Sequence, residues 1–136
     1  MASNWHKLTQ EKMIQEYKVE GYEVKKERKI GFDSKVTRET QFKQVDIVAE
    51  KRNEIILIEI EDLEKKEREL GVGYVELGGI LFLSYLFAKL NPDKKVILLL
   101  IFRDNILNSR KNNINKIKDE FKNICNHLII EIGEEK

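Results

Sequence analysis

The chain has 136 residues, of which 41% are hydrophobic and 36% charged, and this balance predicts one soluble globular domain spanning 1–136 rather than a disordered segment. The single cysteine, Cys125, excludes an internal disulfide and favours a reducing, cytoplasmic location, and the polar N-terminus lacks the apolar stretch of a secretory signal. With 25 basic and 24 acidic residues, the near-neutral charge gives no overall electrostatic argument for nucleic-acid binding.

Helix and strand patterns alternate along the chain. Apolar residues at helical spacing predict a first helix that stops at Gly21 and carries the stripe Trp5, Leu8, Met13, Ile14 and Tyr17. The residues 35–43 suit either a hairpin extension or an exposed loop. The expected elements are a helix over 4–20, strands over 22–30, 44–51 and 54–61, a helix over 73–90, a strand over 96–102, a helix over about 109–124 and a strand over 127–132.

The long connection between the strands at 54–61 and 96–102 contains a helix, as a crossover between parallel strands requires. We therefore expect an α/β fold, with three α/β/α layers on a mixed central sheet and the element order α-β-β-β-α-β-α-β. The strand 44–51 should run antiparallel inside the sheet, and 22–30, whose apolar residues share one parity, should be an outer strand. No internal repeat and no second domain are visible.

The apolar run 73–90 is too short and too interrupted by Glu76 and Gly78-Gly79 for a membrane span, which needs about 20 predominantly apolar residues. We expect a buried helix and no membrane association. A helix with so little polar surface must be covered on more than one side. It is therefore the expected interface of a homodimer.

Three carboxylates stand in the central pair of strands, where a half-buried sheet should be apolar. If Arg52 and Asn53 form a two-residue hairpin loop, Lys51 pairs with Glu54, and Asp46 lies opposite Glu59. The same register places Gln44 opposite Glu61. Like charges directly opposite each other are destabilising unless they reach water, shift a pKa or bind a cation. The pair Asp46 and Glu59 therefore predicts a cation site.

Magnesium prefers oxygen ligands and is usually held by one or two carboxylates. Asp46 and Glu59 supply such a pair, and the main-chain carbonyl of Ile60 offers a further oxygen. Glu61 points the same way as Glu59 and could act as a base toward water or bind a second metal. This arrangement suits metal-assisted hydrolysis of a phosphodiester.

The motif Asp46, followed thirteen residues later by Glu59-Ile60-Glu61, resembles the signature of the PD-(D/E)xK nuclease superfamily, and the element order resembles its restriction-endonuclease-like core. The sequence around both carboxylates is most similar to small archaeal Holliday-junction resolvases and to Mrr- and RecB-like nuclease domains. The resemblance implies a DNA endonuclease in which Asp46 and Glu59 hold Mg²⁺ or Mn²⁺. It also implies an acid from the first helix, for which Glu11 and Glu16 are the candidates.

This chain departs from the family pattern in two places. Val45 precedes Asp46 where a proline is usual, and Glu61 replaces the usual lysine. Some restriction enzymes of the superfamily carry Glu at that position, and Lys43 or Lys65 could supply the lysine from elsewhere. Two further cations, Arg110 and Lys111, begin a basic helix face that could contact phosphate.

Several features also have structural explanations. Asp46 and Glu59 could be solvated at a hairpin end, Glu61 could be a surface residue, and His6, His127 and Cys125 have no ligand-like spacing. The loss of the lysine leaves open a catalytically inactive DNA-binding module. The apolar helix 73–90 and the near-neutral charge leave open a protein-assembly module.

Overall fold

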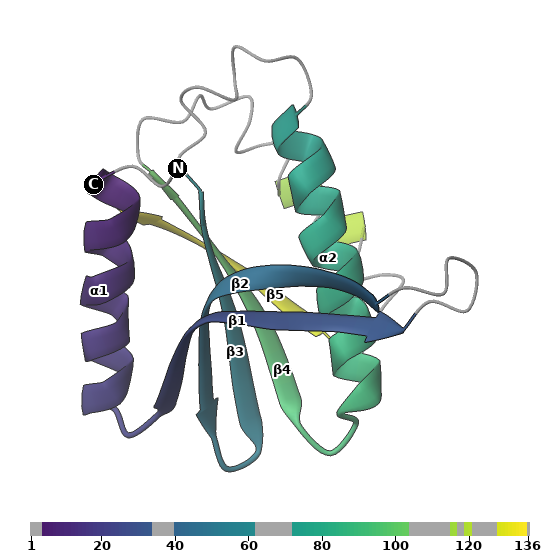
Figure 1. Ribbon diagram of the computed structural model, residues 1–136, viewed down its shortest axis with the longest axis horizontal. Helices are drawn as coiled ribbons and strands as arrows, with labels where there is room; N and C mark the ends of the chain where they lie inside the picture. Colours follow the sequence, from purple (N-terminus) through teal and green to yellow (C-terminus); the bar gives the residue numbers. More distant parts are fainter. Residues whose placement is uncertain are drawn as a thin grey trace.

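The computed structural model describes residues 4–33, 40–61, 72–103, 115–116, 119–120 and 128–135. Two helices cover opposite faces of a twisted sheet (Figure 1). The sheet pairs its strands in the order β1-β2-β3-β4-β5. The elements are α1 (Asn4–Val19), β1 (Glu23–Asp33), β2 (Thr40–Lys51), β3 (Glu54–Glu61), α2 (Val72–Leu90), β4 (Lys95–Arg103) and β5 (Leu128–Glu135).

Strand directions follow from the connections between the elements. β1, β2 and β3 pair antiparallel, whereas β4 pairs parallel to β3 and β5 parallel to β4. The helix α2 connects the parallel strands β3 and β4, as the sequence predicted. The expected α/β class with a mixed sheet in three layers is confirmed. Of the helix expected at 109–124, residues 115–116 and 119–120 are described and helical, and the remainder lies outside the described residues.

The hairpin between β2 and β3 has the predicted loop and register. Lys51 pairs with Glu54 around Arg52 and Asn53, and the ladder continues in step to Ile47 and Ile58. The loop is held from the next strand, because the N–H of Lys95 donates to the carbonyl of Asn53 at 2.7 Å. This loop sets which residues of β2 and β3 lie opposite one another.

Two apolar clusters form the core, one on each face of the sheet. The cluster beneath α1 contains Trp5, Met13 and Ile14 together with Ile47, Ala49, Ile56, Ile58, Ile60, Ile97 and Ile101. The cluster beneath α2 contains Ile80, Leu81 and Ala88 together with alternating residues of the strands, among them Leu57, Leu98 and Phe102. β4 contributes to both clusters, so the prediction of a strand buried on both faces is confirmed.

The first helix differs from the prediction in the face that it buries. Leu8 is 71% exposed, although the sequence placed it in the apolar stripe. Thr9 and Gln10 are buried instead. Within the described residues, no helix is both long and apolar enough to cross a bilayer.

The strands β1 and β2 change faces part-way along their length. Val24 and Ala49 pack on the α1 side, whereas Ile30 and Val45, which share their parities, pack on the α2 side. The change falls at Glu27, the one residue that interrupts the ladder between β1 and β2 and whose φ is 55°. Beyond this point the two strands turn away from β3 and run toward α2 (Figure 1). The apolar residues of β1 and of β2 therefore do not lie on a single face of the sheet, although their parity indicated one.

Candidate functional site

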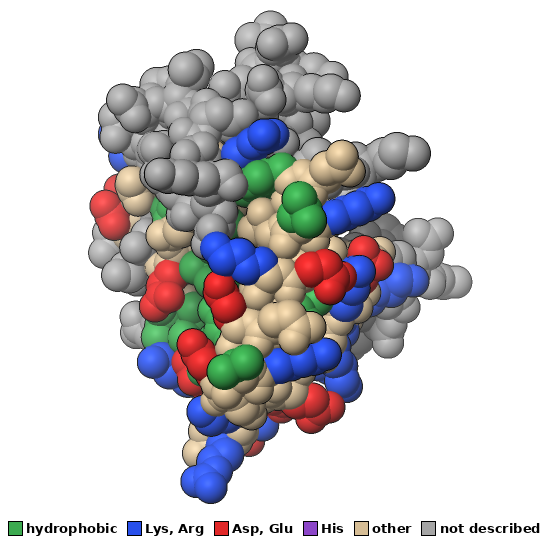
Figure 2. Space-filling model, turned by 90° about the vertical axis from the view of Figure 1, so that its left-hand side faces the viewer, with side chains coloured by type: hydrophobic (Ala, Val, Ile, Leu, Met, Phe, Trp, Pro, Cys, Tyr) green, Lys and Arg blue, Asp and Glu red, His purple; other side chains and the backbone are tan. Residues whose placement is uncertain are grey.

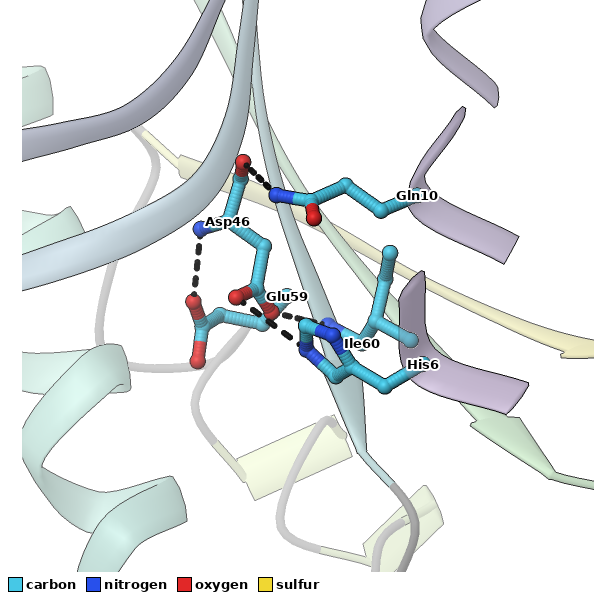
Figure 3. A network of polar contacts seen from close by, with 5 residues as sticks. All are labelled: His6, Gln10, Asp46, Glu59 and Ile60. Carbon is cyan, nitrogen blue, oxygen red and sulfur yellow. Dashed lines mark hydrogen bonds and ion pairs between the residues drawn. The ribbon is translucent and has the colours of Figure 1, made fainter. Parts of the chain in front are cut away.

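The predicted carboxylate pair lies at a fork, the place where β2 leaves β3 (residues 45–47 and 58–60). The β2–β3 ladder ends at Ile47 and Ile58, one pair before the expected pairing of Asp46 with Glu59. Carboxylates bind main-chain groups there. Asp46 Oδ2 accepts the N–H of Ile60 at 2.8 Å, and Glu59 Oε1 accepts the N–H of Asp46 at 3.1 Å (Figure 3). The two side chains thus link the strands where the ladder stops.

Asp46 is also held from the first helix. His6 Nε2 lies 3.2 Å from Asp46 Oδ1, and Gln10 Nε2 donates to the main-chain carbonyl of Asp46 at 2.9 Å. His6 and Gln10 are four residues apart, so they project from one face of α1 and reach the fork together (Figure 3). The carboxylate of Asp46 therefore lies on the α1 side, and the expectation that it shares a flat face with Glu59 is wrong.

The end of β3 carries two buried carboxylates. Glu59 is 3% exposed and Glu61 is 8% exposed, at the carboxyl end of a central strand. Their neighbours Leu57 and Ile60 belong to the α2-side and α1-side clusters respectively. Alternation along the strand therefore directs Glu59 and Glu61 to the α2 side. The fork is thus approached by Glu59 from one side of the sheet and by Asp46 from the other.

The charge state of His6 follows from these neighbours. The hydrogen bond to Asp46 raises the pKa of His6 above its ordinary value of 6.5. Burial acts in the opposite direction, and the negative charges of Asp46, Glu61 and Glu27 raise the pKa further. A protonated imidazole beside Asp46 is consequently stabilised in the folded protein.

The donors at the fork are oxygens, the type that magnesium prefers. Within the described residues, no group of three or more His, Cys, Asp or Glu side chains is placed to hold a metal ion. A site here would have to take Asp46 from the α1 side of the sheet and Glu59 from the α2 side, with the main-chain oxygen of Ile60 and water completing it. That composition fits magnesium, which usually keeps several waters and takes only one or two carboxylates.

No family model, curated protein or solved structure matches this chain.

The other predicted site residues lie apart from the fork or outside the described residues. Glu11 is exposed and pairs with Lys26 Nζ at 3.1 Å, and Glu16 is exposed and lies 4.0 Å from Lys12. The backbone of Lys43 pairs with that of Ile30 in the β1–β2 ladder, but the structure does not describe the Lys43 side chain. Lys65, Arg110 and Lys111, together with His127 and Cys125, lie outside them entirely.

Two residues at the fork were missed by sequence reasoning. His6 has no partner at ligand-like spacing in the sequence, and its contact with Asp46 spans forty positions. Gln10 offered a signal, because a polar residue three positions before Met13 and four before Ile14 continues the buried stripe of the helix. At 2% exposure, Gln10 is a buried polar group that needs a partner, which Asp46 provides.

Proposed function

We propose that this protein is a magnesium-dependent DNA endonuclease that hydrolyses phosphodiester bonds at the fork. The observation that carries the proposal is the pair Asp46 and Glu59 where β2 leaves β3, in which the Glu59 carboxylate accepts the main-chain N–H of Asp46 and the Asp46 carboxylate accepts that of Ile60. Burying a carboxylate is costly, and hydrogen bonds, ion pairs and metal coordination are the arrangements that offset this cost. Glu61, buried two residues further along β3, adds a third acid to the same strand end.

Asp46, Glu59 and the carbonyl of Ile60 are the groups that would hold the metal. A bound divalent ion supplies charge neutralisation of the phosphate and lowers the pKa of bound water. His6 and Gln10 hold the side chain and the main chain of Asp46, which keeps its carboxylate at the fork. Glu61 is placed to act as a base or as a further ligand, in the position where the resembled family carries lysine.

The proposal is tested by incubating the purified protein with duplex, single-stranded and four-way-junction DNA in Mg²⁺, Mn²⁺ or EDTA. We expect metal-dependent cutting of at least one form. Asp46→Asn and Glu59→Gln should each lower the rate by about a hundredfold or more, because each removes a charged metal ligand while keeping an oxygen for the main-chain bond. Glu11→Gln is the matched control, since Glu11 lies on the surface with Lys26.

A different result would reject the nuclease. Wild-type protein that cuts none of the DNA forms in either metal is incompatible with the proposal, as is full activity in Asp46→Asn.

A second function is favoured by the hydrogen bonds themselves. Because Asp46 and Glu59 each bind a main-chain N–H, both have a structural role that does not require a metal. A catalytically inactive nuclease-fold module that binds DNA or assembles with protein would retain them for that reason. DNA binding that is unchanged by EDTA, in a protein that cuts no DNA, would identify this alternative.

A further inference from the structure

The edge strand β1 carries four cations within five residues, Lys25, Lys26, Arg28 and Lys29. The ladder sorts them by face. Lys25 pairs with Val48 and Arg28 pairs with Val45, and both valines belong to the cluster beneath α2. Because directly opposite residues share a face, Lys25 and Arg28 lie on the same side of β1.

Two residues three positions apart on a regular strand point to opposite faces. Here they share a face because Glu27 between them has a φ of 55° and interrupts the ladder. This conformation is sterically unfavourable for a residue with a side chain. Backbone of this kind is concentrated at functional sites, where the surrounding structure maintains it.

The placement relates both cations to the fork. Arg28 lies opposite Val45, the residue next to Asp46. Lys25 lies three positions before Arg28 on the same strand. Their side of the sheet is the side to which alternation directs Glu59. Three strand residues span about 10 Å, so the two cations lie near each other along the edge of the sheet.

The opposite side of β1 faces α1. Lys26 pairs with Glu11 of α1 at 3.1 Å. On the face that α1 covers, basic and acidic side chains are intermingled without a region of one sign (Figure 2). On the side of Lys25, the acids Glu23 and Glu50 pair with each other two residues away, and Arg28 lies on the far side of Lys25 from them.

We propose that Lys25 and Arg28 form a phosphate-binding pair that holds a nucleic-acid backbone beside the fork. This inference rests on the proposed nuclease function and names the surface that binds its substrate. Exposed Lys25 and partly exposed Arg28 contact phosphates of one backbone, without reading base sequence.

The test compares two double variants that remove the same charge from the same strand. Binding of a labelled 20-base-pair duplex is measured in EDTA across a series of salt concentrations. Lys25→Gln with Arg28→Gln should raise the Kd about tenfold and reduce the salt dependence of log K by about 1.8, the slope expected for two lost phosphate contacts. Lys26→Gln with Lys29→Gln, on the opposite face, should change both quantities by much less.

Equal effects of the two double variants would reject the inference, because they would indicate a general charge effect of an edge strand. Wild-type protein without measurable duplex affinity would reject it as well. Binding and cleavage separate this inference from the proposed function. If the wild-type protein cuts DNA but the Lys25→Gln, Arg28→Gln variant binds DNA normally, the phosphate-binding pair is rejected and the nuclease function is not. If the wild-type protein cuts no DNA but the variant loses DNA affinity, the phosphate-binding pair is supported and the nuclease function is rejected.

Discussion

Asp46 and Ile60 are joined across the fork, where the carboxylate of one strand accepts the main-chain N–H of the next at 2.8 Å. Ile60 is 2% exposed, so its N–H has little access to water and needs a partner within the protein. The side chain of Asp46 supplies that partner where the β2–β3 ladder has ended. One residue therefore serves both the architecture of the sheet and the candidate metal site.

Substitution of Asp46 should separate these two roles. Asp46→Ala leaves the N–H of Ile60 without its acceptor, and we expect the free energy of unfolding to fall by about 1–3 kcal/mol. Asp46→Asn keeps an oxygen that can accept the N–H of Ile60, although it loses the charge. Its free energy of unfolding should therefore fall by about 1 kcal/mol or less. Urea denaturation in EDTA measures both values. Equal stability losses in the two variants would show that the Ile60 bond contributes little.

The contact of His6 with Asp46 predicts how stability depends on pH. The hydrogen bond to Asp46 raises the pKa of His6 in the folded protein above its ordinary value. The folded state therefore binds the proton more tightly than the unfolded state. This contribution is complete below the unfolded pKa of about 6.5 and is lost as pH rises through the higher folded pKa.

His6→Gln removes this contribution, so its effect must depend on pH. We expect the difference in unfolding free energy between wild type and His6→Gln to be largest near pH 5.5 and to shrink toward pH 9. Urea denaturation of the metal-free proteins across this range provides the measurement. A difference that is constant with pH, or that grows as pH rises, would contradict the assignment of a raised pKa.

Local patterns predicted much of this fold. The two-residue loop at Arg52 and Asn53 fixed the register of β2 against β3, and the pairs from Lys51–Glu54 to Ile47–Ile58 follow it. The continuous apolar strand β4 and the crossover helix α2 were also found from composition and order. These features depend on neighbours in the sequence, where turn chemistry and apolar periodicity are informative.

The fork could not be predicted in the same way. Strand alternation assumes a regular backbone, but Glu27 adopts a positive φ without a glycine to indicate it. Beyond that residue Ile30, and Val45 on the paired strand, pack in the cluster beneath α2 instead of the cluster beneath α1. The contact of His6 with Asp46 depends on how α1 docks on the sheet, and one sequence carries no direct signal of that distance.

The hairpin loop predicts a stabilising substitution. Arg52 has a φ of 43°, a conformation that costs residues with a side chain about 1–2 kcal/mol and glycine almost nothing. Glycine also adds entropy to the unfolded chain, which offsets part of this gain. Arg52→Gly should therefore raise the free energy of unfolding by about 0.5–1 kcal/mol. The main-chain oxygen that accepts a bond from Lys94 Nζ at 2.8 Å is retained. Asn53→Gly is the control and should stabilise nothing, because Asn53 does not have a positive φ.

The homodimer expected from the apolar helix stays a prediction, and α2 offers a direct test of it. Ile80, Leu81 and Ala88 pack on the sheet, whereas Phe82 is 54% exposed and Leu90 is 68% exposed. Exposed apolar side chains two turns apart on one helix give a surface that a second copy could cover. We expect wild-type protein to sediment at twice the chain mass of 16.1 kDa and Phe82→Glu to sediment as a monomer.

A matched control places the same charge at an equally exposed apolar position. Leu8 is 71% exposed on α1, which covers the opposite face of the sheet. Leu8→Glu should therefore leave the sedimentation of the wild type unchanged. A wild type that remains monomeric at high micromolar concentration would exclude the dimer. A dimer that persists in Phe82→Glu but dissociates in Leu8→Glu would place the interface on α1, because each substitution adds one charge that only a buried interface would have to desolvate.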